Sequence, residues 1–309
     1  MFEETMELCK MPSGLHNPVM LREVIDYLDL KPGKTIVDAT AGLGGHALCI
    51  LKNIMPAGRL ICIDRDQESL ELARENLKDF GSSCEFVHSN FVDIDTVLGS
   101  LKVTKIDGIV FDLGLSSFQL DNPQRGFSFQ NEGPLDMRLD RNSYICAYDL
   151  VNNLNEEEIS AMLWNFGQER WHNRIARFLV QERQKHPIAT TRELSDIVVS
   201  AIPYKYRHYR IHPATRTFQA VRIAVNRELE ILETALKKTI PLLNPSGRIC
   251  VISFHSLEDR IVKLNFRQLA ARGMLNIITP KPLVPGQDEV RDNPSSRSAK
   301  LRVAERLAR

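Results

Sequence analysis

Short apolar runs alternate with amphipathic stretches along the chain. Five of these runs are apolar almost throughout, as expected for parallel strands that are covered on both faces. They lie at residues 35–38, 59–63, 84–88, 106–111 and 248–253. The stretch 67–80 between the second and third runs carries leucines and an alanine at helical spacing. The alternation predicts βαβ units in an open twisted sheet, to which residues 274–279 and 301–305 could add a last antiparallel pair.

The pattern changes between the fourth and fifth runs. Residues 147–202 show helical spacing and no evident strand. Two pairs, Asn155 with Glu158 and Thr190 with Glu193, have the spacing of capping boxes that open helices. This part of the chain is therefore expected to be entirely helical.

A longer helix is predicted to begin near Pro213 and to end at Pro241, because proline interrupts helical hydrogen bonding. It would lead the chain back to the sheet. We therefore expect a discontinuous α/β domain, residues 1–122 and 213–309, with an inserted all-α domain at residues 123–212. The alternative is one continuous larger domain.

Composition narrows the function classes only slightly. The 309 residues carry a formal net charge of +1, so any role with nucleic acid must rest on local clusters. No apolar run approaches the roughly 20 residues that span a bilayer, and the acidic N-terminal stretch resembles no signal peptide, which favours a cytoplasmic protein with no membrane partner. The six cysteines show no C-x-x-C spacing, so no metal site is expected.

A glycine-rich loop follows the first apolar run, where residues 36–46 read IVDATAGLGGH. Glycines allow the backbone to approach a ligand, and the following helix would offer free N–H groups. The spacing of Gly42, Gly44 and Ala47 also fits a dinucleotide fingerprint, so the loop alone does not choose a cofactor. Asp38 discriminates, because a carboxylate at that position would repel a pyrophosphate. It suits the ammonium and sulfonium groups of S-adenosylmethionine.

Three further strand ends carry groups that fit the same cofactor. Asp64 ends the second run, about twenty residues beyond the loop, where an acid can accept both ribose hydroxyls in either type of site. Phe91 follows the third run and could stack on adenine, and Asp112 follows the fourth, near the switch point of the sheet. Together with Asp38, these residues predict an S-adenosylmethionine-dependent methyltransferase.

The residues alone leave the methyl acceptor open. No cysteine follows the fourth run, which disfavours methylation at carbon-5 of a pyrimidine. Enzymes that methylate exocyclic amines usually carry an Asp/Asn-Pro-Pro-aromatic motif there, whereas residues 112–117 read D-L-G-L-S-S.

Longer motifs resemble one family closely, and they extend over essentially the whole chain. They are D-G-I-V-F-D-L-G-L-S-S at 107–117, Q-L-D at 119–121, R-G-F-S-F at 125–129, P-L-D-M-R at 134–138, H-P-A-T-R-T-F-Q-A at 212–220, S-F-H-S-L-E-D-R at 253–260 and R-S-A-K-L-R at 297–302, with His16-x-Pro18-Val19-Met20 near the start. The sequence resembles the bacterial ribosomal RNA small subunit methyltransferase H family (MraW).

That resemblance implies a Rossmann-like methyltransferase sheet with an inserted helical domain. It implies methylation of the N4 amine of a decoding-centre cytidine in 16S rRNA, on the small ribosomal subunit. The family's cofactor contacts fall on Gly44, Gly45, His46, Asp64, Phe91, Asp112 and Gln119. Gln119 is nominated by the resemblance alone. Leu43, where the family often has glycine, and Gln168, where it often has glutamate, are small departures.

The acceptor side of the site has only candidates. Ser116 and Ser117 could orient the target amine or could simply form a turn, and His255 could face the target base or be a hydrogen-bonded loop residue. Two clusters, residues 204–210 and 291–309, carry cations that could hold RNA or could be solvated surface. The sequence names no general base, indicates no protein partner and leaves the oligomeric state open.

Three rival functions remain at this stage. The first is a dinucleotide-dependent oxidoreductase, which Asp38 disfavours. The second is a non-catalytic RNA chaperone or assembly factor, which the full set of strand-end ligands disfavours. The third is a methyltransferase that acts on protein or DNA, which only the family resemblance disfavours.

Overall fold

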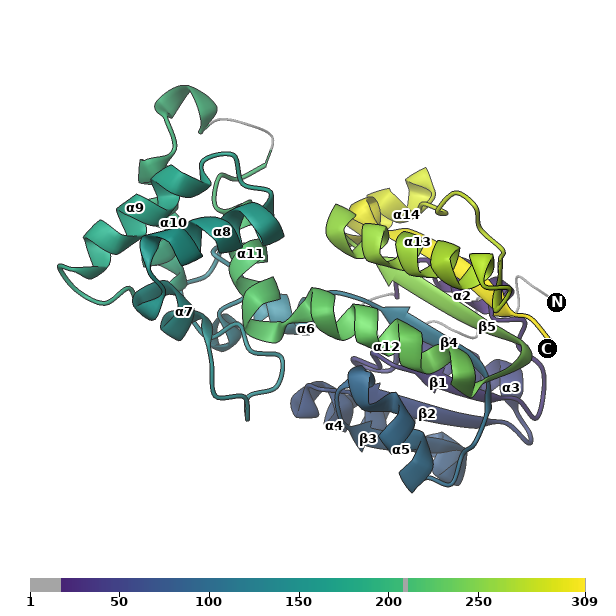
Figure 1. The fold of residues 1–309 in the computed structure, drawn as a ribbon. Coiled ribbons are helices and arrows are strands. Elements are labelled where there is room, and N and C mark those ends of the chain that lie inside the picture. The colour runs from purple at the N-terminus through teal and green to yellow at the C-terminus, as the bar shows by residue number, and fades with distance from the viewer. Residues whose placement is uncertain (1–17, 208–210, 309) are drawn as a thin grey trace. The chain divides into compact units, whose positions relative to one another are not determined.

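The structure, a computed structural model, describes residues 18–207 and 211–308 (Figure 1). The chain forms two compact units. One, which we call the α/β unit, comprises Met1–Gly114 and Leu229–Arg309, and the other, the helical unit, comprises Leu115–Glu228. Each unit is described by itself.

A seven-stranded sheet with the order β3-β2-β1-β4-β5-β7-β6 forms the centre of the α/β unit. Its strands are β1 Thr35–Asp38, β2 Arg59–Asp64, β3 Cys84–His88, β4 Ile106–Asp112, β5 Leu243–Ser253, β6 Leu275–Ile277 and β7 Lys300–Arg306. The first five are parallel, and β7 pairs antiparallel with both β5 and β6. The five predicted strands and the antiparallel tail are thus confirmed. The strand order reverses between β1 and β4, where such sheets bind ligands.

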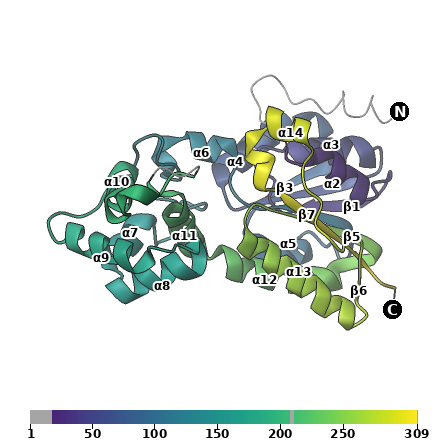
Figure 2. The same ribbon diagram turned by 90° about the horizontal axis from the view of Figure 1, so that it is seen from above.

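Helices cover both faces of the sheet, which explains why the strands are apolar throughout (Figure 2). One face packs against α5 Ile94–Ser100, α12 Glu228–Leu242 and α13 Ser256–Ala271. The other packs against α2 Leu21–Tyr27, α3 Gly45–Ile54 and α4 Gln67–Asn76. Short helices α14 Gln287–Asp292, η1 Lys78–Ser83, η2 Phe91–Asp93 and η5 Pro294–Ser298 lie in connecting segments. None of the helices in the described ranges is long and apolar enough to cross a membrane.

The helical unit has an apolar core of its own. Its helices are α6 Ser117–Asp121, η3 Pro123–Arg125, α7 Ala147–Asn153, α8 Glu156–Gly167, α9 His172–Arg183, α10 Thr191–Ala201, η4 Tyr204–Tyr206 and α11 Thr215–Asn226. The two predicted capping boxes are confirmed: Asn155 and Glu158 open α8, and Thr190 and Glu193 open α10. An all-α insertion therefore interrupts the α/β unit.

Two details differ from the sequence-based expectations. The long helix is broken into α11 and α12 at Arg227, which has a left-handed backbone (φ 51°), and Pro241 lies within the last turn of α12 instead of ending it. The helical unit also extends beyond residues 123–212. Phe218 and Val221 of α11 are buried in its core, so the segment that was expected to lead back to the sheet belongs to the insertion.

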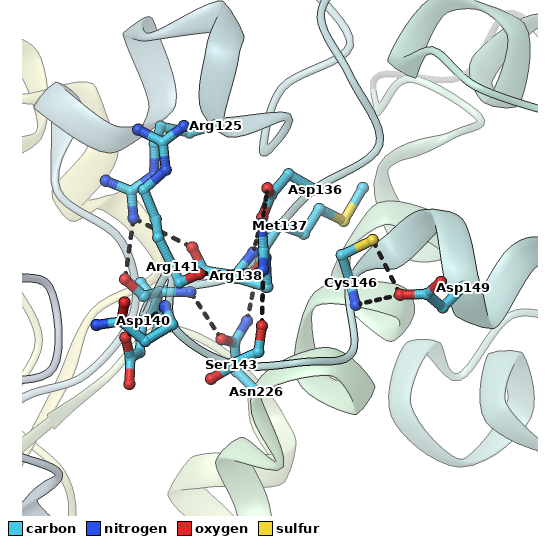
Figure 3. A network of polar contacts seen from close by, with 12 residues as sticks. Arg125, Asp136, Met137, Arg138, Asp140, Arg141, Ser143, Cys146, Asp149 and Asn226 are labelled. Atoms are coloured by element: carbon cyan, nitrogen blue, oxygen red, sulfur yellow. Dashed lines mark hydrogen bonds and ion pairs between the residues drawn. The ribbon is translucent and has the colours of Figure 1, made fainter.

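A hydrogen-bond network ties the loop before α7 to α11 (Figure 3). Asn226 donates from Nδ2 to the carbonyl of Met137 (2.7 Å) and accepts from the backbone N–H of Leu139 (2.9 Å). The guanidinium of Arg125, which is 1% exposed, donates to the carbonyls of Arg138 (3.1 Å) and Leu139 (3.0 Å). Because buried polar groups must find partners, these contacts fix the loop as part of the helical unit.

Candidate active site

The glycine loop turns tightly between β1 and α3. Gly42 and Gly44 have left-handed backbones (φ 50° and 89°), which glycine adopts without strain. Gly45 starts α3 under a close contact, because a Cβ added there would lie 2.6 Å from Cγ of Pro18. The three glycines therefore allow a backbone path that larger residues would obstruct.

Asp64 at the end of β2 holds this loop. Its Oδ2 accepts a hydrogen bond from the N–H of Gly42 (2.8 Å), and its Oδ1 accepts one from the N–H of Asp66 (2.8 Å). A carboxylate offers about four acceptor positions, so Asp64 retains capacity for the ribose hydroxyls that the sequence assigned to it. The bond to the loop is a second role, which the sequence did not indicate.

Asp38 and Asp112 bring two further carboxyl groups to the same edge of the sheet. Asp38 is 1% exposed, and its Oδ1 accepts a bond from the N–H of Thr40 (3.2 Å). The hydroxyl of Thr40 in turn accepts from the N–H of Asp112 (2.7 Å), which joins the ends of β1 and β4. Among the described residues, Oδ2 of Asp38 and Oδ1 of Asp112 are buried without a hydrogen-bond partner.

Burial makes these acids reluctant to ionise. It raises the pKa of Asp38 to about 7 and that of Asp64 to about 6. Burial, together with the charges of Asp38 and Glu258, raises the pKa of Asp112 well above its usual range. The edge of the sheet thus gathers carboxyl groups whose charged forms are poorly stabilised in the absence of a cation.

The neighbouring His46 does not neutralise this charge. Burial lowers its pKa to about 4, so the imidazole is neutral at physiological pH. Its Nε2–H donates to the carbonyl of Val19 (3.1 Å), and its Nδ1 lies 3.6 Å from Oδ2 of Asp112. His46 therefore fixes geometry at this edge without supplying a cation.

A bound cation would satisfy the carboxyl groups. The ammonium and sulfonium groups of S-adenosylmethionine carry positive charge. They would offset the charge of Asp38 and Asp112, each of which has one buried carboxyl oxygen without a hydrogen-bond partner among the described residues. A pyrophosphate would instead add negative charge beside Asp38 and Asp112, at a high electrostatic cost. These carboxyl groups therefore fit the positive charge of S-adenosylmethionine, and they would repel the pyrophosphate of a dinucleotide.

Phe91 begins the short helix η2, three positions after β3 ends at His88. Its ring meets that of Phe111 in β4 edge-on, with centroids 5.5 Å apart and planes at 89°. This contact orients Phe91 near the carboxyl edge of the sheet, which is compatible with the predicted stacking on adenine. That stacking stays a prediction.

The remaining candidates have structural tasks that the sequence did not specify. In the helical unit, Ser116 and Gln119 form a capping box: the hydroxyl of Ser116 accepts from the N–H of Gln119 (3.3 Å), and Oε1 of Gln119 accepts from the N–H of Ser116 (3.1 Å). The Ser117 hydroxyl takes no part in this cap. In the α/β unit, His255 caps α13 by accepting from the N–H of Glu258 at Nδ1 (3.4 Å). The prediction that His255 is a hydrogen-bonded residue is thus confirmed, and a contact with the target nucleobase stays a prediction.

The structure therefore brings together Gly44, Gly45, His46, Asp64 and Asp112 at one edge, with Asp38 beside them. Gln119, Ser116 and Ser117 belong to the other unit. Sequence reasoning missed Thr40, which links Asp38 to Asp112. The sequence did contain an indication of this link, because Thr40, a small residue with a hydroxyl group, follows the strand-end residue Asp38 by two positions.

The two cation-rich clusters differ in their contacts. In the first, Lys205 lies 4.9 Å from the ring centroid of Tyr206. Outside the cluster, the guanidinium of Arg170 lies 5.7 Å from the same ring and 5.4 Å from that of Trp171. Tyr204 is 73% exposed; residues 208–210 lie outside the described residues.

Ion pairs occupy several cations of the second cluster. Arg302 and Lys300 lie 2.6 Å and 3.6 Å from the carboxylate of Asp259, and Arg291 pairs with Asp288 and Asp292. Arg309 lies outside the described residues. The first cluster, in which cations lie beside aromatic rings, is therefore the better candidate for binding RNA.

Comparison with known proteins shows the family of the chain. The model of the MraW methylase family matches residues 13–307. A ribosomal RNA small subunit methyltransferase H from Halothermothrix orenii is 48% identical over 307 residues, covering 94% of this chain and 98% of that protein. Its counterpart from Pelobacter propionicus is 49% identical over 308 residues, with the same coverage. Among solved structures, a putative rRNA-methylase from Clostridium thermocellum is 13% identical, with a TM-score of 0.47 over 95% of this chain and 100% of that one. The chain belongs to the MraW methylase family and is an S-adenosylmethionine-dependent methyltransferase.

Proposed function

We propose that this methyltransferase modifies the N4 amine of a decoding-centre cytidine in 16S rRNA, within the small ribosomal subunit and in the cytoplasm. The observation that carries the proposal is the match along nearly the whole chain to proteins named ribosomal RNA small subunit methyltransferase H. The choice of cytidine and of N4 rests on the resemblance of the motifs at residues 107–138, 212–220 and 253–260 to that family.

The α/β unit would hold the cofactor. Asp38 and Asp112 would face its positive charge, Asp64 its ribose and Phe91 its adenine, with the glycine loop and His46 closing around it. S-adenosylmethionine supplies an electrophilic methyl group when bound. The work of these residues is to position it and to exclude water, which accounts for much of the catalysis in such transfers.

The acceptor amine makes two demands on the protein. Its lone pair is conjugated with the cytosine ring, so a nearby group must accept an N–H proton as the nitrogen becomes nucleophilic. The base must also leave its stack to reach the methyl group. Ser116, Ser117 and His255 stay the candidate acceptors. Ser116 and Nδ1 of His255 serve helix caps, whereas Nε2 of His255 is, among the described residues, a buried atom without a hydrogen-bond partner.

The helical unit is the proposed site of RNA recognition. Arg170, Trp171, Lys205 and Tyr206 interleave cations with aromatic rings, and Tyr204 exposes its ring beside them. Such surfaces stack bases and contact phosphates. The guanidinium of Arg207 donates hydrogen bonds to the carbonyls of Ile202 (2.8 Å) and Ser200 (3.1 Å). These bonds tie the segment at Tyr204–Tyr206 to the end of α10.

A reconstituted reaction tests the proposal. Small subunits from cells that lack the protein would be incubated with the enzyme and S-adenosylmethionine carrying a labelled methyl group, and the labelled nucleoside would be identified. We expect label in N4-methylcytidine of 16S rRNA, and none when Asp112→Asn replaces the wild type. Label in protein, in another nucleoside or in DNA would refute the proposed substrate. Binding of NADH in place of S-adenosylmethionine would support the oxidoreductase alternative.

A further inference from the structure

An open pocket lies on the helical unit between α8 and α9. It has a volume of about 500 Å³. Its lining includes Glu156, Glu157, Ser160, Trp164, His172 and Asn173. None of them is a lysine or an arginine.

An exposed tryptophan forms one wall of this pocket. Trp164 is 55% exposed, although large aromatic side chains generally find cover in a folded domain. Its ring is held by a tilted contact with the imidazole of His172, with centroids 5.1 Å apart. His172 is in turn fixed, since its Nδ1 lies 2.8 Å from the hydroxyl of Ser160, which donates to Oδ1 of Asn173 (2.7 Å). The wall is therefore preorganised.

The charge of the pocket is negative. Glu156 and Glu157 both contribute to its lining, and Glu156 forms a loose pair with the exposed side chain of Arg177 at 3.7 Å. These carboxylates outweigh the positive end of the α8 dipole, which is worth about half an elementary charge. An indole face beside carboxylates attracts a cation, both through the ring quadrupole and through direct charge.

We propose that this pocket binds an arginine side chain presented by a basic protein. A guanidinium is planar, so it can stack on the indole of Trp164, and the carboxylates of Glu156 and Glu157, which line the same pocket, favour its positive charge. RNA is disfavoured at this surface, because the two carboxylates would repel its phosphates. The pocket is thus a protein-docking site, distinct in chemistry from the surface at Tyr204–Tyr206, and the proposal does not depend on the methylated nucleotide.

A titration with a small probe tests the charge requirement directly. The full-length ¹⁵N-labelled protein would be titrated with the acetylated, amidated tripeptide Gly-Arg-Gly, and the indole N–H signal of Trp164 would be followed by NMR. The chain has only two tryptophans, so Trp164→Phe assigns the signal. The control ligand replaces arginine with citrulline, which has nearly the same shape and no charge.

We expect saturable shifts of the Trp164 signal with the arginine peptide, weakening as salt is added, and no saturation with the citrulline peptide. The double variant Glu156→Gln, Glu157→Gln should weaken binding by about tenfold. The matched control Glu230→Gln, Glu233→Gln, on the exposed side of α12, should leave binding unchanged.

Three results would overturn the proposal. One is equal binding of the arginine and citrulline peptides, and another is unchanged affinity in the Glu156→Gln, Glu157→Gln variant. The third is a saturable shift of the Trp164 signal with a short single-stranded RNA but not with the arginine peptide, which would make the pocket a base-stacking site. Thermal unfolding of each variant verifies that the helical unit is intact.

Discussion

Replacing Asp38 with asparagine should stabilise the empty protein and weaken cofactor binding at the same time. The substitution preserves the shape of the side chain and an oxygen that can accept from the N–H of Thr40. It removes a charge that burial destabilises and that a cationic ligand would satisfy. Opposite changes in stability and affinity are expected only if the carboxylate serves the ligand.

The magnitude follows from the pKa of Asp38, which rises from 3.8 to about 7 in the folded protein. A shift of this size corresponds to roughly 4 kcal/mol of destabilisation once the group is fully ionised. Because the folded pKa exceeds the unfolded one, this cost grows as the pH rises from about 4 to about 7 and then levels off. A buried amide N–H₂ without an acceptor offsets about 1–3 kcal/mol of the gain. We therefore expect Asp38→Asn to raise the Tm by about 2–6 °C at pH 8.

Cofactor binding should change in the other direction. Loss of a charge-assisted contact costs about 1.5–3 kcal/mol, so the Kd for S-adenosylmethionine should increase by about 10-fold to 150-fold. Calorimetric titration measures the affinity, and thermal unfolding without ligand at pH 5 and pH 8 measures the stability. Asp79→Asn, at an exposed position on the same unit, is the matched control. Wild-type affinity in Asp38→Asn would refute the reasoning, as would a Tm gain of equal size at pH 5 and pH 8.

Four other outcomes are expected. The affinity of the wild type for S-adenosylmethionine should fall on the order of tenfold between pH 7.5 and pH 5.5, because Asp38 and Asp64, with pKa values of about 7 and about 6, become protonated; an unchanged Kd in calorimetry would contradict this. Gly45→Ala should lower both the Tm and the cofactor affinity, since its Cβ would lie 2.6 Å from Cγ of Pro18, and wild-type values for both would count against that contact. Asn226→Ala should destabilise the helical unit by about 2–3 kcal/mol in limited proteolysis, while calorimetry finds cofactor binding retained. Lys205→Glu should weaken binding of small-subunit RNA several-fold in filter assays and leave the cofactor Kd unchanged; equal RNA affinity would exclude the cluster.

The sheet could be predicted because each of its parallel strands is recognisable from a short stretch of sequence. Strands buried on both faces must be apolar throughout, and the five predicted runs match β1 to β4 closely and the second half of β5. The carboxyl ends of parallel strands share one edge, so Asp38, Asp64 and Asp112 could be brought together without coordinates.

The remainder depended on tertiary contacts that leave little trace in the sequence. Arg227 adopts a left-handed backbone with no glycine to signal it, so the break between α11 and α12 was missed. The spacing of Phe218 and Val221 is compatible with packing against the sheet or within the helical unit. Only the packing seen in the structure assigns them to the helical core. The bond from Gly42 to Asp64 joins residues 22 positions apart, and no periodicity reports it.

The most direct test of the proposed function is a nucleoside comparison in cells. Small-subunit rRNA from cells with and without this protein would be digested, and N4-methylcytidine would be quantified by mass spectrometry, with the modified fragment located in the sequence. We expect the methyl group at N4 of one decoding-centre cytidine to disappear without the protein and to return with the wild type but not with Asp38→Asn. Equal N4 methylation in the two strains would contradict the proposed function.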